Sequence, residues 1–297
     1  MTRAAVTTGH LTAALELPPG LDTGPAITAA DRLPGGWRLA APPPVTLPDR
    51  LVLTVSDTAS TGPEVRLDGQ TVHLNLLHRA ARTSTLAYVT YTALERARQQ
   101  RQMLTLHANT LVTPSGHGIL LLGNKGAGKS SVALALGSRG WTHAGDDLSV
   151  LAEEAPDVLI LPGKPTAAVR SDDPSLWQAP KPVITLAPLL RVPVPLVGII
   201  RLTVHPAVPR PLITDATPFS ANEQLRLHEA LARYISGLPT PLTGPAGAPY
   251  GPVWPLDDPS LARWRTHLIA RLEQHPYSYL HAPGPQTAAD LITRRYT

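Results

Sequence analysis

The sequence predicts an α/β fold, in which a mixed β-sheet with flanking helices follows a small β-rich region at the amino terminus. Three observations lead to this prediction. Residues 120–151 combine an apolar strand, a glycine-rich turn, a helix and a second strand. Segments with helical apolar spacing recur on both sides of this stretch. Residues 50–76 instead alternate apolar and polar side chains, as strands do. We therefore expect two regions, residues 1–83 and residues 84–297.

The amino-terminal region contains a hairpin signal. RLVLTVSDT from residue 50 and EVRLDGQTVHLNL from residue 64 alternate in polarity, and Asp68-Gly69 interrupts the second stretch as a tight turn would. A small antiparallel sheet is the expected result. The following segment, STLAYVTYTALERARQQRQM at 84–103, has apolar residues at helical spacing and an arginine-rich polar face, which predicts an amphipathic helix.

The central elements follow in order along the chain. LTLHANTLV (104–112), the turn TPSGHG and GILLLG (118–123) predict a hairpin that leads into a glycine-rich loop. A helix is expected from Lys129 to Arg139, ending at Gly140, and then a strand over WTHAGDDLSVL (141–151). Further strands are expected near residues 158 and 197, and further helices at 221–235, 260–274 and 286–295.

The glycine-rich loop carries the most specific motif of the chain. Residues 123–130 fit G-x-x-x-x-G-K-[ST] at every position, between an apolar strand and a helix. Glycines let backbone N–H groups converge on phosphate oxygens, and the helix presents its positive end to the same anion. We expect Lys129 to reach the β- and γ-phosphates of ATP and the Ser130 hydroxyl to bind Mg²⁺. The predicted nucleotide-binding residues are Gly123, Asn124, Lys125, Gly126, Ala127, Gly128, Lys129, Ser130 and Ser131.

Two adjacent carboxylates form the second chemical feature. Asp146 and Asp147 come seventeen and eighteen residues after Lys129, at the end of or just within the strand that follows the motif helix. The carboxyl ends of neighbouring parallel strands flank one crevice, so this pair can face a bound γ-phosphate. One carboxylate can hold Mg²⁺ while the other accepts a proton from an attacking hydroxyl. The alternative is a pair of turn-capping side chains on the surface.

Composition excludes several other classes of function. The chain is 43% hydrophobic and 16% charged, which is typical of globular proteins, and its net charge of +4 comes from scattered arginines, so no nucleic-acid surface is expected. Neither a secretory signal nor a membrane span is expected, because charged residues and prolines interrupt the apolar stretches. With no cysteine, disulfides and thiolate chemistry are excluded and a cytoplasmic location is expected. HExxH and GxSxG motifs are absent.

The segment LHANTLV...GHGILLLGNKGAGKSSVALALGSRGWTHAGDDLSVL resembles the core of the HPr kinase/phosphorylase family. That family has a His-small residue pair in a strand, a hairpin, a GxxGxGKS loop, a helix ending in Arg-Gly and an Asp-Asp strand. The resemblance implies, for residues 84–297, a P-loop catalytic domain of the HPr kinase/phosphoenolpyruvate carboxykinase type. It also implies transfer of a phosphoryl group from ATP to a serine hydroxyl.

The resemblance assigns roles to individual residues. His107, Lys129, Asp146 and Asp147 would form the catalytic cluster, with Asp146 as the base and Asp147, together with Ser130, as the Mg²⁺ partner. A homo-oligomer is implied as well, since HPr kinases assemble as hexamers. The stand-alone kinases of this family, found beside peptide-tailoring and other specialised biosynthetic genes, phosphorylate a serine of a precursor peptide or a small molecule.

Three hypotheses about function follow. The first is a Mg²⁺- and ATP-dependent kinase that acts on a serine or other hydroxyl of a peptide or protein. The second is a kinase for a hydroxyl of a small metabolite; a strict shikimate-type fold is disfavoured because some 120 residues precede the loop. The third is a nucleotide-binding switch that acts through a partner and requires neither a base nor an acceptor pocket.

Overall fold

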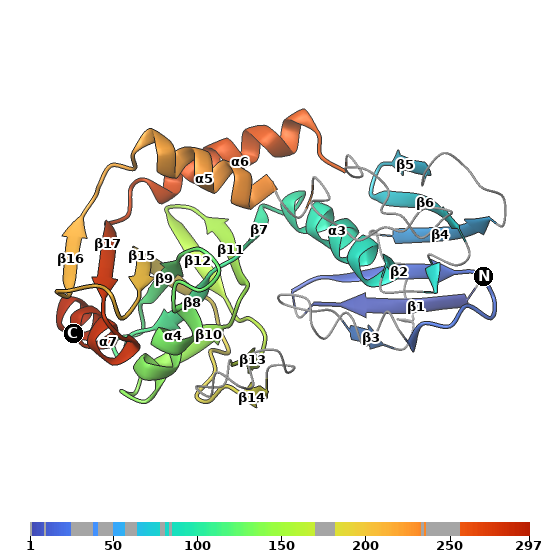
Figure 1. Ribbon diagram of the computed structural model, residues 1–297. Helices are drawn as coiled ribbons and strands as arrows, with labels where there is room; N and C mark the ends of the chain where they lie inside the picture. The colour runs from blue at the N-terminus through green and yellow to red at the C-terminus, as the bar shows by residue number, and fades with distance from the viewer. Residues whose placement is uncertain are drawn as a thin grey trace. The chain divides into compact units, whose positions relative to one another are not determined.

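The computed structural model describes residues 2–8, 10–24, 38–40, 50–56, 64–77, 81–82, 85–169, 182–232, 235 and 256–297 (Figure 1). The chain divides into two compact units. The first comprises Met1–Gln102 and Leu231–Arg265, and the second comprises Met103–Ala230 and Thr266–Thr297. Each unit combines a β-sheet with helices, so the predicted α/β class is confirmed.

The first unit contains a six-stranded sheet in the order β3-β1-β2-β4-β6-β5. Its elements are β1 (Thr2–Thr7), β2 (Thr12–Leu17), β3 (Arg38–Ala40), β4 (Arg50–Ser56), β5 (Glu64–Asp68), β6 (Thr71–Leu77) and α3 (Thr85–Gln99). The predicted hairpin is confirmed, since Asp68 of β5 lies opposite Thr71 of β6. The wholly antiparallel sheet is wrong, because β4 runs parallel to both β2 and β6. Strand β6, rather than β5, lies beside β4, and β5 is the edge strand of the sheet.

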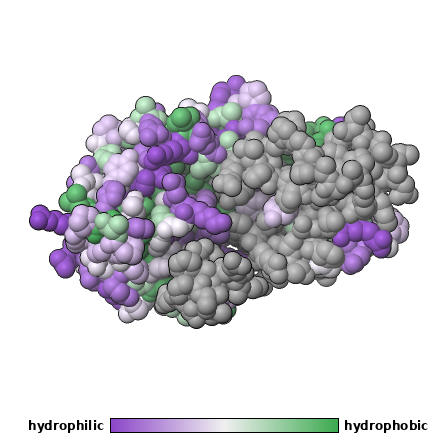
Figure 2. Space-filling view, viewed as in Figure 1, coloured by the Kyte–Doolittle hydropathy of each residue, from purple (hydrophilic) through white to green (hydrophobic). Residues whose placement is uncertain are grey.

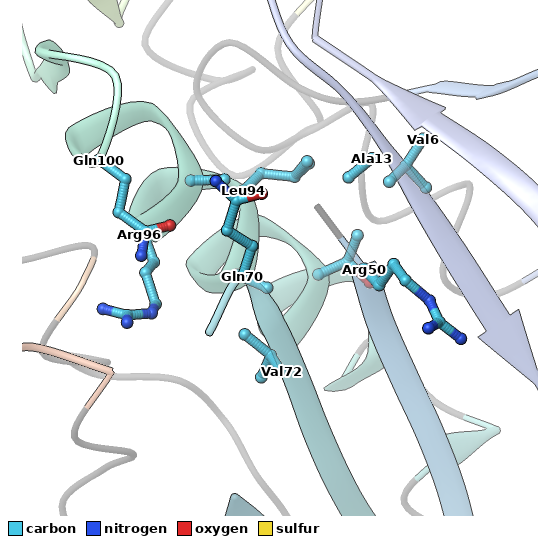
Figure 3. A pocket seen from close by; sticks show the side chains of 11 residues that line it. Val6, Ala13, Arg50, Gln70, Val72, Leu94, Arg96 and Gln100 are labelled. Carbon is cyan, nitrogen blue, oxygen red and sulfur yellow. The ribbon is translucent and has the colours of Figure 1, made fainter. Parts of the chain in front are cut away.

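Helix α3 packs against this sheet. Its Leu94 lines a pocket together with Val6, Ala13 and Val72 from β1, β2 and β6 (Figure 3). The first unit therefore includes α3, and its first segment ends at Gln102. The sequence predicted a boundary between the two regions at residues 83 and 84. The walls of the pocket are largely aliphatic, and two arginines that contribute to its lining have their guanidinium groups paired with carboxylates. These pairs are Arg50–Glu16 at 2.5 Å and Arg96–Asp258 at 2.9 Å.

The second unit contains a nine-stranded mixed sheet with the strand path β10-β8-β9-β15-β12-β11-β7, to which β17 and β16 are added through β15. Its strands are β7 (Met103–Leu106), β8 (Asn109–Val112), β9 (Gly118–Leu122), β10 (Thr142–Gly145), β11 (Ser149–Glu154), β12 (Asp157–Leu161), β15 (Val194–Val204), β16 (Leu212–Asp215) and β17 (Tyr277–Ala282). A separate ribbon pairs β13 (Thr166–Ala168) with β14 (Val183–Thr185). Its helices are α4 (Lys129–Gly137), α7 (Pro285–Tyr296) and most of α5 (Ala221–Ala232), whereas α6 (Pro259–Leu272) is divided between the two units at Arg265–Thr266.

One hydrophobic core fixes the helix that follows the glycine loop. It joins β8, β9, β15 and β17 to helices α4 and α7, which lie side by side (Figure 1). Leu121 of β9, Val132 of α4 and Ile292 of α7 are all completely buried there. Because β9, β15 and β17 are parallel, their carboxyl ends lie at one end of the sheet, where β9 continues into the loop and α4 begins.

Two predicted strands are each divided in the structure. The segment 104–112 breaks at His107–Ala108 into β7 and β8, and the segment 141–151 breaks between Gly145 and Ser149 into β10 and β11. Both breaks have the same cause. Strand β7 pairs with β11, whereas β8 pairs with β9 and β10, so each segment crosses from one part of the sheet to another. The predicted hairpin formed by β8 and β9 is confirmed.

Hydrophilic residues cover most of the described surface in the view of Figure 2, with small hydrophobic patches between them. The most exposed large aliphatic side chains among the described residues belong to Val183, Val192, Leu212 and Leu225. Within the described part of the chain, no helix has the length and apolar character needed to cross a bilayer.

Candidate active site

The loop between β9 and α4 can be built only with glycine at two positions. Gly128 has a φ of 89°, and an added Cβ would lie 2.8 Å from Val204 Cβ at the end of β15. At Gly123 an added Cβ would lie 2.8 Å from Ala127 Cβ. The loop therefore packs tightly against the carboxyl end of β15.

Helix α4 begins with a cation and with backbone donors. Gly128 is the N-cap and makes no side-chain cap hydrogen bond, and the first turn contains no acidic residue. Such a helix start favours an anion. Lys129 is buried, and its Nζ donates to the Gly123 carbonyl at 2.9 Å, so the ammonium lies at the loop itself. The other predicted loop positions Asn124, Lys125 and Gly126 are exposed, as is Ser131 on the first turn.

The two aspartates occupy a tight turn at the end of β10. Asp147 adopts a left-handed backbone with a φ of 64°, and the Leu148 N–H donates to the Asp146 carbonyl at 2.8 Å. The turn separates the environments of the two carboxylates. Asp146 is only 6% exposed, whereas the Asp147 side chain is 52% exposed. Ser130, on the first turn of α4, lies close enough to the Asp146 carboxylate to lower the pKa of that group as a hydrogen-bond donor.

His107 lies at the other strand break. Its Nε2 is 2.7 Å from Asp147 Oδ1, and its side chain is 31% exposed. The four residues assigned to a catalytic cluster by the resemblance are thus distributed as two neighbouring groups. Asp146 lies near Ser130, the residue that follows Lys129, and His107 contacts Asp147.

A buried asparagine, which the sequence analysis missed, joins these groups. Asn109, at the start of β8, is completely buried; its Nδ2 donates to Asp146 Oδ1 at 2.5 Å, and its Oδ1 accepts from the Asp147 N–H at 3.2 Å. A signal was present in LHANTLV, because an amide side chain stands two positions after His107 at the start of a predicted strand.

A third segment closes against the aspartate turn. The Gly163 N–H donates to the Ala144 carbonyl at 2.6 Å, and an added Cβ at Gly163 would lie 2.5 Å from that oxygen. Further along the same segment, the Ala168 backbone lies close enough to the Asp146 carboxylate to lower the pKa of that group. No motif marks these residues, because their contribution comes from the backbone.

The environment of Asp146 raises the pKa of its carboxyl group. Burial is the largest cause, since it disfavours the charged form, and the neighbouring Asp147 charge acts in the same direction. Hydrogen bonds from Ser130, Asn109 and the Ala168 backbone oppose this increase. The charge of Asp146 therefore depends on how far these hydrogen-bond donors offset the effect of burial.

The oxygen atoms at this site fit Mg²⁺ in a nucleotide complex. A hydroxyl and a carboxylate, from Ser130 and Asp146, lie near each other, and Asp147 adds a second carboxylate next to them. Mg²⁺ usually binds through one or two protein oxygens together with substrate phosphates. Among the described residues no group of three or more His, Cys, Asp or Glu side chains forms a protein-only metal site.

No family model and no curated protein matches the chain. Among solved structures, it is similar to the Hpr(Ser) kinase/phosphatase from Coxiella burnetii, with 22% sequence identity and a TM-score of 0.29. The similarity covers 38% of this chain and 76% of that chain.

We predict that Gly128→Ala destabilises the protein more than Gly116→Ala. Both glycines have nearly the same positive φ, 89° and 88°, but an added Cβ at Gly116 meets nothing within 4 Å. Alanine strains the backbone at both positions. In Gly128→Ala the contact with Val204 adds a further loss of roughly 1–3 kcal/mol in the free energy of unfolding. Urea unfolding of both variants measures this difference, and equal losses would contradict the tight packing of the loop.

The pKa of Asp146 predicts a pH-dependent effect of Asp146→Asn on stability. A raised folded-state pKa means that this carboxyl favours folding below the ordinary value of 3.8 and that its contribution is lost as the pH rises through the raised pKa. Asp146→Asn should therefore gain stability relative to wild type as the pH increases over that interval. Urea unfolding without Mg²⁺ across this pH range measures the difference, and a difference independent of pH would refute the prediction.

Proposed function

We propose that the protein is a Mg²⁺- and ATP-dependent kinase that transfers the γ-phosphate to a hydroxyl group. The observation that carries this proposal is the position of the buried Asn109, which lies opposite Leu121 near the end of β9, where the glycine loop begins, and donates to the Asp146 carboxylate. It joins the glycine loop, which suits a polyphosphate, to the aspartate turn, which suits proton and metal chemistry. A surface pair of turn-capping aspartates does not account for the burial of Asp146 or for this contact.

The loop and α4 would bind the triphosphate. Backbone N–H groups at the start of α4 would donate to its oxygens, and Lys129 would exchange its bond to the Gly123 carbonyl for one to the β- and γ-phosphates. Bound Mg²⁺ supplies charge neutralisation across these phosphates. Together these groups position the γ-phosphorus and stabilise the charge that spreads over its oxygens during transfer.

The contacts favour exchanging the roles of Asp146 and Asp147 that the resemblance implies. Asp146 lies near Ser130 and has little exposed surface, so we assign it to the Mg²⁺ side of the site. Asp147 is half-exposed, and its carboxylate contacts His107 at 2.7 Å, so we assign it to proton acceptance from the incoming hydroxyl. His107 would orient this carboxylate and share the proton.

We propose a serine of a peptide or protein as the acceptor, in a specialised biosynthetic pathway, as the resemblance of residues 104–151 to stand-alone kinases suggests. A metabolite hydroxyl would use the same loop and aspartates. The test below separates the two classes of acceptor.

The test is incubation of the protein with Mg²⁺ and γ-labelled ATP, together with peptides encoded by neighbouring genes and a panel of hydroxyl metabolites. Asp147→Asn should lower the transfer rate by about 10²–10⁴-fold, because it removes the proposed base. It should leave the Kd of Mg²⁺-ATP nearly unchanged, whereas Asp146→Asn should weaken binding of ATP in Mg²⁺ more than in its absence. Ser115→Ala, in the turn between β8 and β9, is the control.

The two outcomes lead to different conclusions. Label on a peptide or on a metabolite, lost in Asp147→Asn, supports the kinase and identifies its acceptor class. Tight binding of ATP without any labelled acceptor, and with the same behaviour in Asp147→Asn, would contradict the kinase and favour the nucleotide-binding switch.

A further inference from the structure

We infer that Asn109 is a positioning residue that holds Asp146 and Asp147 in different orientations, an inference that rests on the proposed function. Asn109 touches neither nucleotide phosphate nor acceptor in this proposal. It acts through Asp146 and Asp147, because its amide nitrogen donates to the first and its amide oxygen accepts from the backbone of the second.

The chemistry of the side chain explains why an amide is suited to this position. Asp146 Oδ1 requires a donor and the Asp147 N–H requires an acceptor, and a planar amide presents one of each from the same carbon. A carboxylate at residue 109 would oppose Asp146 with a like charge. An aliphatic side chain of similar size would satisfy neither group, and the position is completely buried from solvent.

The backbone position of Asn109 is itself firmly held. Strand β8 is paired on both edges, with β9 and with β10. The amide therefore extends from a rigid strand to a turn that contains a left-handed residue, Asp147, and its acceptor stabilises that conformation.

This arrangement separates the two carboxylates. The Asp146 carboxylate lies near Ser130 and the start of α4, while the Asp147 side chain is left to contact His107. Loss of the amide would release both constraints at once, so the two proposed roles would be impaired together although Lys129 and the glycine loop remain in place.

The test compares Asn109→Leu with Ser149→Ala, a matched control that removes buried hydrogen bonds next to the site but none to an aspartate. We expect Asn109→Leu to reduce the kcat of γ-phosphate transfer by about 10–100-fold, as loss of an outer-shell partner does. We expect the Kd of ATP without Mg²⁺ to change less than about twofold, because the loop is intact, and the gain in affinity on adding Mg²⁺ to decrease. Ser149→Ala should keep wild-type values of kcat and of both binding constants.

The results distinguish this inference from the proposed function. If Asn109→Leu matches Ser149→Ala in kcat and in the Mg²⁺-dependent gain of affinity, both variants having lost similar stability in urea, then Asn109 is only structural and the inference is overturned. Asp147→Asn, measured in parallel, reports on the proposed function: its inactivity would preserve the kinase even if Asn109 proved dispensable. A wild-type protein with no transfer still tests the inference through the two binding constants.

Discussion

Two segments of the second unit, residues 103–112 and 142–154, each leave one part of the sheet and enter another at adjacent points, and the candidate site depends on this double crossing. At the first crossing the chain presents His107 and Asn109, and at the second it presents Asp146 and Asp147. In a continuous strand the adjacent Asp146 and Asp147 would point to opposite faces of the sheet. Breaking both strands at the same level lets polar side chains gather around one buried amide instead.

The glycine loop adds the third component because β9 lies next to β8 and runs antiparallel to it. The carboxyl end of β9 therefore reaches the end of the sheet from which β8 starts. The hydrophobic core that joins α4 and α7 to β9, β15 and β17 then holds the first turn of α4, with Ser130, near the carboxylate of Asp146. Packing of apolar side chains thus determines the position of groups that carry charge.

Much of this architecture could be predicted from local patterns. Strand and helix periodicity predicted α3, β9, α4 and α7, and the loop motif predicted a phosphate-binding turn because its glycines have a direct steric cause. The two strand breaks were not predictable in the same way, since apolar side chains continue on both sides of His107 and of Asp146. Only the choice of pairing partners distinguishes β7 from β8, and that choice is a non-local property.

The site residues divide along similar lines. Lys129, Ser130 and the aspartate pair were recognisable because their chemistry and spacing are specific, whereas Asn109 is a single amide outside any motif and Gly163 acts through its backbone. No local sequence pattern predicts that residues 231–265 belong to the first unit. Long-range contacts, rather than propensities of individual segments, decide these features.

The central claim is that the loop and the aspartate turn form one nucleotide site. A crystal structure of the protein with Mg²⁺ and a non-hydrolysable ATP analogue tests it most directly. The account predicts the β- and γ-phosphates on the backbone N–H groups at the start of α4, with Mg²⁺ near Ser130 and Asp146 and the γ-phosphate facing Asp147. A nucleotide bound elsewhere, or a triphosphate directed away from both aspartates, would contradict it.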